Sequence, residues 1–267
     1  MLEQALDFRQ ESNSVYALVD PLEEGDFDRP TQFKNWTPNH ILQHLHFFNM
    51  LADLSLIDED AFTRRYDEMK KLREVGGDIL SATDELLDGL KGHALKSAWC
   101  DYYREMADRW VKADPKQRLK WAGPTMSARS SISARLMETW SHAQALFDML
   151  GVERHNTDRI KSIAVLGVNT FGWTFSNRGE DVPKERPFVR LQAPSGKMWE
   201  WGDEKSRNYI TGPAEAFCMV VTQTRNVADV ALEVRGDVAT QWMAKAQCFA
   251  GVAREAPKPG TRFVSVR

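Results

Sequence analysis

The sequence predicts an α+β protein, with an N-terminal antiparallel helical bundle over residues 1–152 and a smaller C-terminal α/β sheet domain over residues 157–267. Apolar residues recur at three- and four-residue steps through most of the first part, which is the period of amphipathic helices. Gly and Pro positions interrupt that period where an antiparallel bundle needs turns. After Val152 prolines become frequent, and one segment alternates apolar and polar residues as a half-buried strand does. A length of 267 residues suits two ordinary domains.

The first part contains the longer helices. Thr37 and Pro38 are typical of an N-cap and a first helical residue, and Gly151 is typical of a C-cap. Ser81 or Thr83 is expected to cap a short helix after the Gly76-Gly77 break. The predicted helices cover residues 2–19, 38–55, 58–75, 81–90, 93–113 and 126–150.

The second part mixes helices with strands. The segment 188–193 alternates apolar and polar residues, and the turn 194–197 predicts a hairpin with 198–201. Gly212-Pro213 is expected to open a helix that continues to about Thr222. The remaining predicted elements are a helix over 157–175, a strand over 230–234, a helix capped by Asp237 and ending at Cys248, and a last strand over 262–266.

Composition narrows the class of protein. A net charge of −3 and a pI of about 6.1 argue against a broad nucleic-acid footprint. No apolar run approaches the roughly 18 residues that span a bilayer, and the acidic N-terminus is unlike a signal peptide. We therefore expect a cytoplasmic protein that does not span a membrane and has no broad nucleic-acid surface. Cys100, Cys218 and Cys248 are widely spaced in apolar contexts and are interpreted as buried, reduced thiols.

A candidate site lies on the helix predicted over 126–150. Glu138 and His142 are four residues apart, so they stack on one helical face. Such a pair can hold one divalent metal, or the two side chains can hydrogen-bond to each other. A third ligand is available if His44, two turns into the helix after Thr37, faces the same core. The alternative for His44 is a core histidine whose ring nitrogens are satisfied by other groups.

These residues resemble a known family. Trp36-Thr37-x₆-His44-Leu45 and Glu138-x₃-His142 are similar to the two metal-binding elements of the DinB-like, mycothiol-dependent maleylpyruvate isomerase N-terminal domain. The resemblance implies a DinB-like four-helix bundle in which His44, Glu138 and His142 bind a divalent metal and leave positions open for water. Zinc is the expected metal, and the same donors suit nickel, iron or manganese.

The likeness continues through the chain into a less characterised branch of that family. Its second-half elements are Ala193-Pro194-Ser195-Gly196-x₂-Trp199-x-Trp201-Gly202 and Trp242-x₄-Gln247-x-Phe249-Ala250-Gly251. They are similar to a segment labelled as a wyosine-base-formation domain. This part of the resemblance indicates branch membership and carries little mechanistic information.

The resemblance implies a metal-dependent isomerase or transferase that uses a low-molecular-weight thiol on a small organic acid or thioester. Two alternatives stay open: a non-catalytic metal-binding module, and an RNA (wyosine) modification factor suggested only by the label on the second half. The acidic pI and the lack of an aromatic and basic strand face disfavour RNA. A homodimer is compatible with the sequence, which does not determine the oligomeric state.

Four further residues are weaker candidates. His40, one turn before His44, is interpreted either as a proton shuttle near the metal or as a surface histidine. Arg129 and Arg135 precede the ligands on their helix and can clamp a carboxylate or form ordinary salt bridges. Arg225 is a candidate of the same kind from the second domain.

Overall fold

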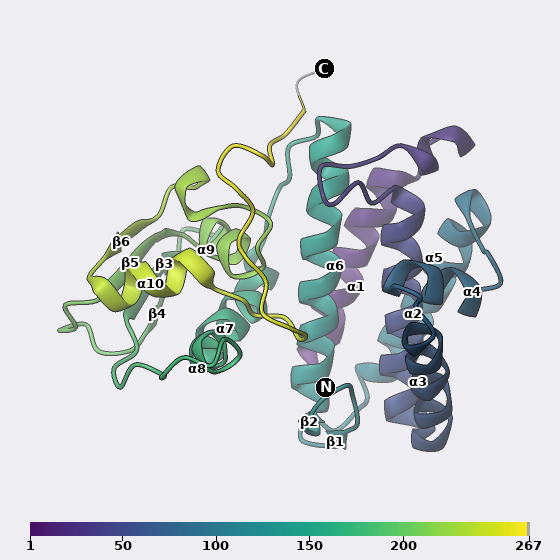
Figure 1. Ribbon diagram of the computed structural model, residues 1–267, viewed down its shortest axis with the longest axis horizontal. Coiled ribbons are helices and arrows are strands. Elements are labelled where there is room, and N and C mark those ends of the chain that lie inside the picture. Colours follow the sequence, from purple (N-terminus) through teal and green to yellow (C-terminus); the bar gives the residue numbers. More distant parts are fainter. Residues whose placement is uncertain (266–267) are drawn as a thin grey trace. The chain divides into compact units, whose positions relative to one another are not determined.

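A computed structural model describes residues 1–265, and the chain forms two compact units, Met1–Met149 and Leu150–Arg267 (Figure 1). The first unit is built of helices, and the second combines short helices with a four-stranded sheet. The predicted pairing of a helical N-terminal region with a C-terminal sheet domain is therefore confirmed. None of the described helices combines the length and the apolar character needed to cross a bilayer.

The first unit contains six α-helices among the described residues. Two of the intervening segments form a short antiparallel hairpin, in which Arg118 pairs with Ser127 and Leu119 with Met126. The elements are α1 (Glu3–Val19), the 3₁₀ helix η1 (Glu24–Asp28), α2 (Pro38–Ile57), α3 (Glu59–Glu74), α4 (Ile79–Leu86), α5 (Gly92–Trp110), β1 (Arg118–Leu119), β2 (Met126–Ser127) and α6 (Ala128–Leu150).

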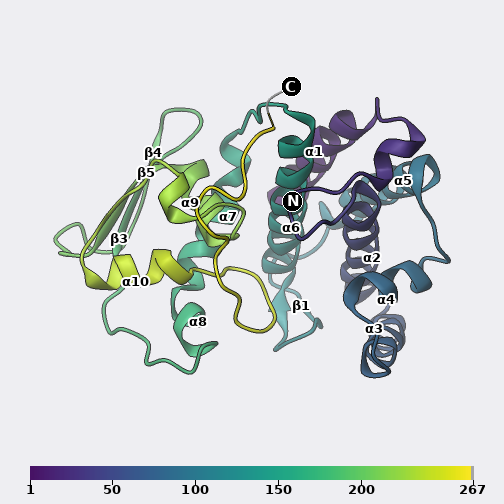
Figure 2. The same ribbon diagram turned by 45° about the horizontal axis from the view of Figure 1, so that its top comes forward.

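Helix α2 is central to the packing of this unit. Helix α5 packs against both α1 and α2, and α3 and α4 cover a further side of α2. Helix α6 lies beside α1 in both views (Figures 1 and 2), and its Arg135 donates a hydrogen bond to the backbone of α2 at Leu45. Buried Trp99 and Trp110 of α5 and Trp140 of α6 fill the core. The side chains of α2 and α6 are thus held at fixed positions by the bundle.

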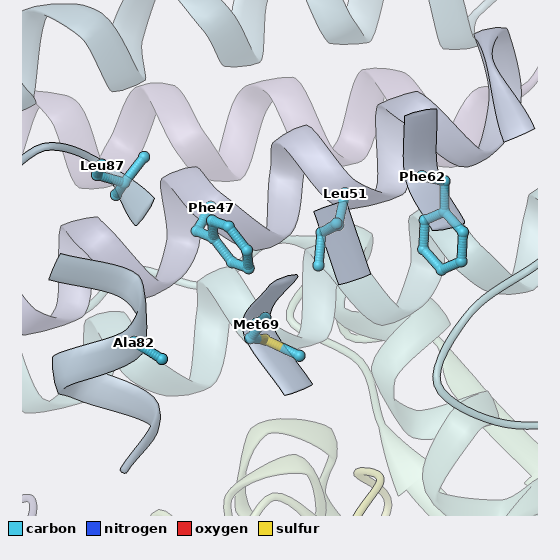
Figure 3. Close-up of a cluster of buried hydrophobic side chains, with 6 residues drawn as sticks. All are labelled: Phe47, Leu51, Phe62, Met69, Ala82 and Leu87. Carbon is cyan, nitrogen blue, oxygen red and sulfur yellow. The ribbon is translucent and has the colours of Figure 1, made fainter. Parts of the chain in front are cut away.

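A hydrophobic cluster fixes α3 and α4 on α2. Its members are fully or almost fully buried and come from all three helices or their ends, as Figure 3 shows. Burial of this area accounts for the docking of α3, which is otherwise strongly charged. The cluster residues are Phe47, Leu51, Phe62, Met69, Ala82 and Leu87.

The caps explain where two of these helices begin. Thr37 Oγ1 accepts a hydrogen bond from the His40 amide at 3.3 Å, and Pro38 is the first residue of α2, as predicted. For α4 the expected cap was wrong. Asp78, not Ser81 or Thr83, accepts from the Ser81 amide at 2.9 Å, so the helix begins two residues earlier than predicted.

The start of α6 is also corrected. Met126 and Ser127 belong to strand β2, and the helix therefore begins at Ala128. Helical periodicity does not reveal a two-residue strand, because its backbone partner lies elsewhere in the sequence.

The second unit is organised around a sheet with strand order β4-β3-β5-β6. Strands β3 and β5 are parallel, and both outer pairs are antiparallel. Val189 and Leu191 of β3 and Ile210 of β5 are buried, and α9 contacts both strands on one face of the sheet (Figure 2). The elements are η2 (Asp158–Ile160), α7 (Lys161–Asn169), α8 (Phe171–Ser176), β3 (Phe188–Gln192), β4 (Met198–Trp201), β5 (Tyr209–Pro213), α9 (Ala214–Val221), η3 (Val227–Asp229), β6 (Glu233–Arg235) and α10 (Asp237–Lys245).

The β3–β4 hairpin was predicted, but strand β5, which pairs with β3, was not. Strand β5 ends at Gly212-Pro213, which from the sequence alone indicated only the start of a helix. Gly212 has φ +149°, and a Cβ there would lie 2.5 Å from the Ala231 carbonyl oxygen, so the close approach of the backbone requires glycine. The dipeptide thus both ends the strand and opens α9.

Four other boundaries in this unit differ from the prediction. The helix expected over 157–175 breaks at Thr170, and the strand expected over 230–234 is Glu233–Arg235, because only those residues pair with β5. Helix α10 ends at Lys245, and Gly236 rather than Asp237 occupies its N-cap position. Residues 262–265 form no strand, since alternation alone supplies no pairing partner, and Val266 lies outside the described residues.

Candidate metal centre

The candidate site lies within the first unit, between α2 and α6. His44 is two turns into α2, and α6 carries Glu138 and His142 one turn apart. One donor atom from each of the three side chains lies within 4.8 Å of the other two. The Nε2 atoms of His44 and His142 each lie 3.3 Å from Glu138 Oε2. The three residues singled out by the sequence are therefore brought together.

The charges of the site favour metal-binding protonation states. Burial, with repulsion from His142, lowers the pKa of His44 to about 4. Burial alone would raise the pKa of Glu138, but hydrogen bonds from His142 and His44 outweigh it and hold that pKa well below its ordinary value. At neutral pH the centre therefore offers a neutral imidazole at His44 and an ionised carboxylate, the forms that a metal requires.

The spacing of the donors also fits a metal ion. Two ligand atoms about 2.0 Å from one ion, at a tetrahedral angle, lie roughly 3.3 Å apart. The two nitrogen–oxygen distances on Glu138 have this value. The side chains of His44, Glu138 and His142 remain 13%, 23% and 13% exposed, so a small ligand can reach them. Three protein donors with an accessible side are typical of a catalytic rather than a closed structural zinc site.

Aromatic side chains hold the two imidazoles in place. Trp36 stacks on His142 with an interplanar angle of 2° and 5.3 Å between ring centroids. Phe33 meets the same ring edge-on at 5.2 Å, and Phe48 lies 4.7 Å from the His44 ring. Among the described residues, the Nδ1 atoms of His44 and His142 are buried without a hydrogen-bond partner. The rings are thus oriented by packing, where many metal sites use a hydrogen bond to the second nitrogen.

The structure places the four weaker candidates in different environments. His40 is half-buried and is not a free surface group, because its Nδ1 accepts a hydrogen bond from the Thr37 amide at 3.1 Å in the α2 cap. Its role as a proton shuttle stays a prediction. Arg129 is exposed, whereas Arg135 is buried one turn before Glu138. Arg225 is buried in the second unit, where its Nη1 donates to the Thr224 carbonyl at 3.0 Å.

Several residues at this centre were missed by sequence reasoning. Phe33 lies in an irregular segment without periodicity, and nothing in its context singled it out. Trp36 appeared only as a motif position, although its place directly before the cap of the ligand helix was an available signal. Asn49 accepts a hydrogen bond from Arg135 Nε at 3.0 Å, a pairing between helices that sequence spacing does not encode.

Comparison with known proteins identifies the family. The model of the mycothiol maleylpyruvate isomerase N-terminal domain matches residues 8–147, which is more than half of the chain and includes all three candidate ligands. The protein belongs to this family. The DinB-like resemblance found in the sequence is therefore confirmed for the first unit, while the wyosine-related likeness of the second half stays a prediction.

Relatives extend the match over nearly the full chain. Two uncharacterized proteins of Mycobacterium tuberculosis, from strains H37Rv and CDC 1551, are each 34% identical over 245 residues, covering 92% of this chain and 94% of theirs. A crystal structure of the mycothiol-dependent maleylpyruvate isomerase matches with a TM-score of 0.51 and 16% identity, covering 82% of this chain and 87% of that one. A histidine-to-alanine mutant of that isomerase matches equally well. At this identity the structural match establishes the shared fold.

Proposed function

We propose that this family member binds a divalent metal ion through His44, Glu138 and His142, and is a thiol-using isomerase or transferase. Its substrate is a small organic acid or thioester. The observation that carries the proposal is the convergence of the three donors within 4.8 Å in a chain of this family. The family and the matched structure are named for a mycothiol-dependent maleylpyruvate isomerase, which supports a low-molecular-weight thiol as the second reactant.

Each residue of the site has a distinct role in the proposed function. Glu138 supplies the one negative charge of the donor set, and the imidazoles of His44 and His142 supply the other two donors. Trp36, Phe33 and Phe48 pack against the imidazoles and keep them oriented. A divalent ion held there supplies a Lewis acid that lowers the pKa of a bound thiol or polarises a carbonyl group. Zinc suits the donor set, and nickel, iron and manganese are accepted by the same atoms.

The test is a metal-dependent turnover assay with the full chain. Mycothiol and maleylpyruvate, the compounds in the family name, are the first thiol and acid to use. We expect isomerisation or thiol-adduct formation that disappears on metal removal and returns with zinc. Glu138→Ala should lower kcat/KM at least a hundredfold, while the matched control Arg129→Ala, on the exposed side of the same helix, should stay near wild type.

The same assay separates an enzyme from a non-catalytic metal-binding module. Stoichiometric metal that depends on Glu138, with no turnover of any thiol and acid pair tried, would favour the module. Turnover unaffected by chelation would contradict the proposal outright.

A further inference from the structure

Arg135 is a buried cation next to the candidate metal centre. The residue is 7% exposed and sits one turn before Glu138 on α6. Its Nε donates to Asn49 Oδ1 at 3.0 Å, and its Nη2 donates to the Leu45 carbonyl at 3.3 Å. Both acceptors are neutral. A buried guanidinium is ordinarily matched by a carboxylate, because an unpaired charge in a protein interior is costly.

The polar partner of Arg135 is an amide where a carboxylate would fit. Asn49 is fully buried, and among the described residues its Nδ2 has no hydrogen-bond partner. An aspartate has the same shape and would pair with the guanidinium directly. The asparagine therefore fixes the position of Arg135 without cancelling its charge. Burial lowers the pKa of Arg135 to about 10, with Glu138 opposing the shift, so the side chain stays charged at neutral pH.

Arg135 interacts electrostatically with the candidate ligands across the protein interior rather than through water. Phe48 lies against both groups, with the guanidinium carbon 6.0 Å from its ring centroid and the His44 ring 4.7 Å from it. Charges interact more strongly across such apolar material than across water. Without metal, the positive charge of Arg135 and the negative charge of Glu138 cancel. With a divalent ion and neutral imidazoles, the group of metal, Glu138 and Arg135 carries a net charge of +2, which only further anions can offset.

We propose that Arg135, held in its charged position by Asn49, makes the metal centre select an anion over a neutral molecule as the ligand that completes it. Arg135 is thus a positioning residue: without touching the ligand, it favours binding of a negatively charged one. This inference rests on the proposed metal binding and adds a specificity to it. It assigns to the site a thiolate or an organic carboxylate in preference to a neutral thiol, amide or amine.

Asn49→Asp is the decisive variant, because it changes charge while keeping shape. The full chain is loaded with Co²⁺, and azide and imidazole are titrated separately while the absorption spectrum of the metal is followed. Azide represents a small anion and imidazole a neutral ligand of similar reach. We expect Asn49→Asp to weaken azide binding at least about tenfold, to leave imidazole binding within about twofold, and to tighten Co²⁺ binding.

Two further variants control for damage to the fold. Arg135→Met removes the charge and should reproduce the loss of azide affinity, while Arg129→Gln removes an exposed charge from the same helix and should change nothing. Equal azide affinity in wild type and Asn49→Asp, or equal losses of azide and imidazole, would overturn the inference while leaving metal binding intact. Failure of the wild-type chain to take up Co²⁺ would instead reject the proposed function, and the inference with it.

Discussion

The indole of Trp36 lies parallel to the imidazole of His142, with an interplanar angle of 2° and centroids 5.3 Å apart. The same indole is 5.5 Å from the His44 ring, so one side chain supports both histidine ligands. Because Trp36 immediately precedes the Thr37 cap, the start of α2 and the orientation of the ligands are set together. The cap of a helix thus contributes to the geometry of the site.

Replacing Trp36 by Leu should loosen both imidazoles. We expect metal affinity to fall about tenfold, the lower end of the effect of losing an orienting partner, with the metal stoichiometry unchanged at saturation. Isothermal titration of the metal-free protein measures the affinity. Trp173→Leu removes an exposed tryptophan from the second unit and serves as the control. Equal affinities in the two variants would show that the stacking does not orient the ligands.

Replacing Asp53 by Ala should strongly destabilise the bundle. This carboxylate is fully buried and accepts hydrogen bonds from Arg109 Nε at 3.1 Å, Trp110 Nε1 at 2.9 Å and Tyr102 OH at 3.2 Å. The loss leaves the buried Trp110 indole N–H without its acceptor and the Arg109 guanidinium with only the exposed Glu105 carboxylate at 3.5 Å. We expect a fall of about 3–5 kcal/mol in the free energy of unfolding.

Urea unfolding measures that loss. Asp108→Ala removes the acid of an exposed pair with Arg9 and should cost less than about 1 kcal/mol. If the two variants were equally stable, the buried network would contribute no more than a surface ion pair.

Replacing Leu51 by Ala should weaken the docking of α3 and α4. Leu51 is 4% exposed in the cluster of Figure 3, and its truncation is expected to cost about 2–5 kcal/mol. Ile57→Ala, at the end of the same helix, removes a side chain that is 56% exposed and should change the stability by about 0.5 kcal/mol or less. Thermal unfolding of both variants gives the comparison, and matching midpoints would speak against a packed cluster.

Stability should fall on acidification because of His46. Burial lowers the pKa of His46 from 6.5 to about 4, so between these values the unfolded chain binds more protons than the folded one. The contribution of His46 to the free energy of unfolding should therefore be constant above about pH 7 and decrease towards pH 4, by about 3 kcal/mol at most.

The contribution of His46 is isolated by difference, because His44 has the same lowered pKa in metal-free protein. His46→Gln should flatten the dependence of stability on pH in the metal-free chain, and His44 should account for part of the remainder. An unchanged slope in His46→Gln would show that this imidazole does not titrate as its burial implies.

Much of the first unit could be predicted from the sequence, because helix ends and helical faces depend on residues close together in the chain. Thr37, Pro38 and Gly151 mark helix ends through the chemistry of their own backbones, and Glu138 and His142 share a face by spacing alone. His44 was joined to them through the family resemblance, since no local rule relates two helices ninety residues apart. The aromatic support of the ligands was out of reach for the same reason.

The errors concentrate where structure depends on pairing between distant segments. Strand β5 is recognisable only beside β3 and β6, and the two-residue strands β1 and β2 exist only as a pair. The alternation at 262–265 resembles a strand in sequence but forms none. The role of Asn49 likewise depends on its hydrogen bond with Arg135 on another helix, which the sequence alone does not show.

The central claim is that His44, Glu138 and His142 hold one divalent metal ion. The most direct test is the metal content, by inductively coupled plasma mass spectrometry, of the purified full chain and of His44→Ala, Glu138→Ala and His142→Ala. We expect about one ion per wild-type chain and less than a tenth of that in each variant, with Arg129→Ala unchanged. Equal metal content in the wild type and all three ligand variants would contradict the claim.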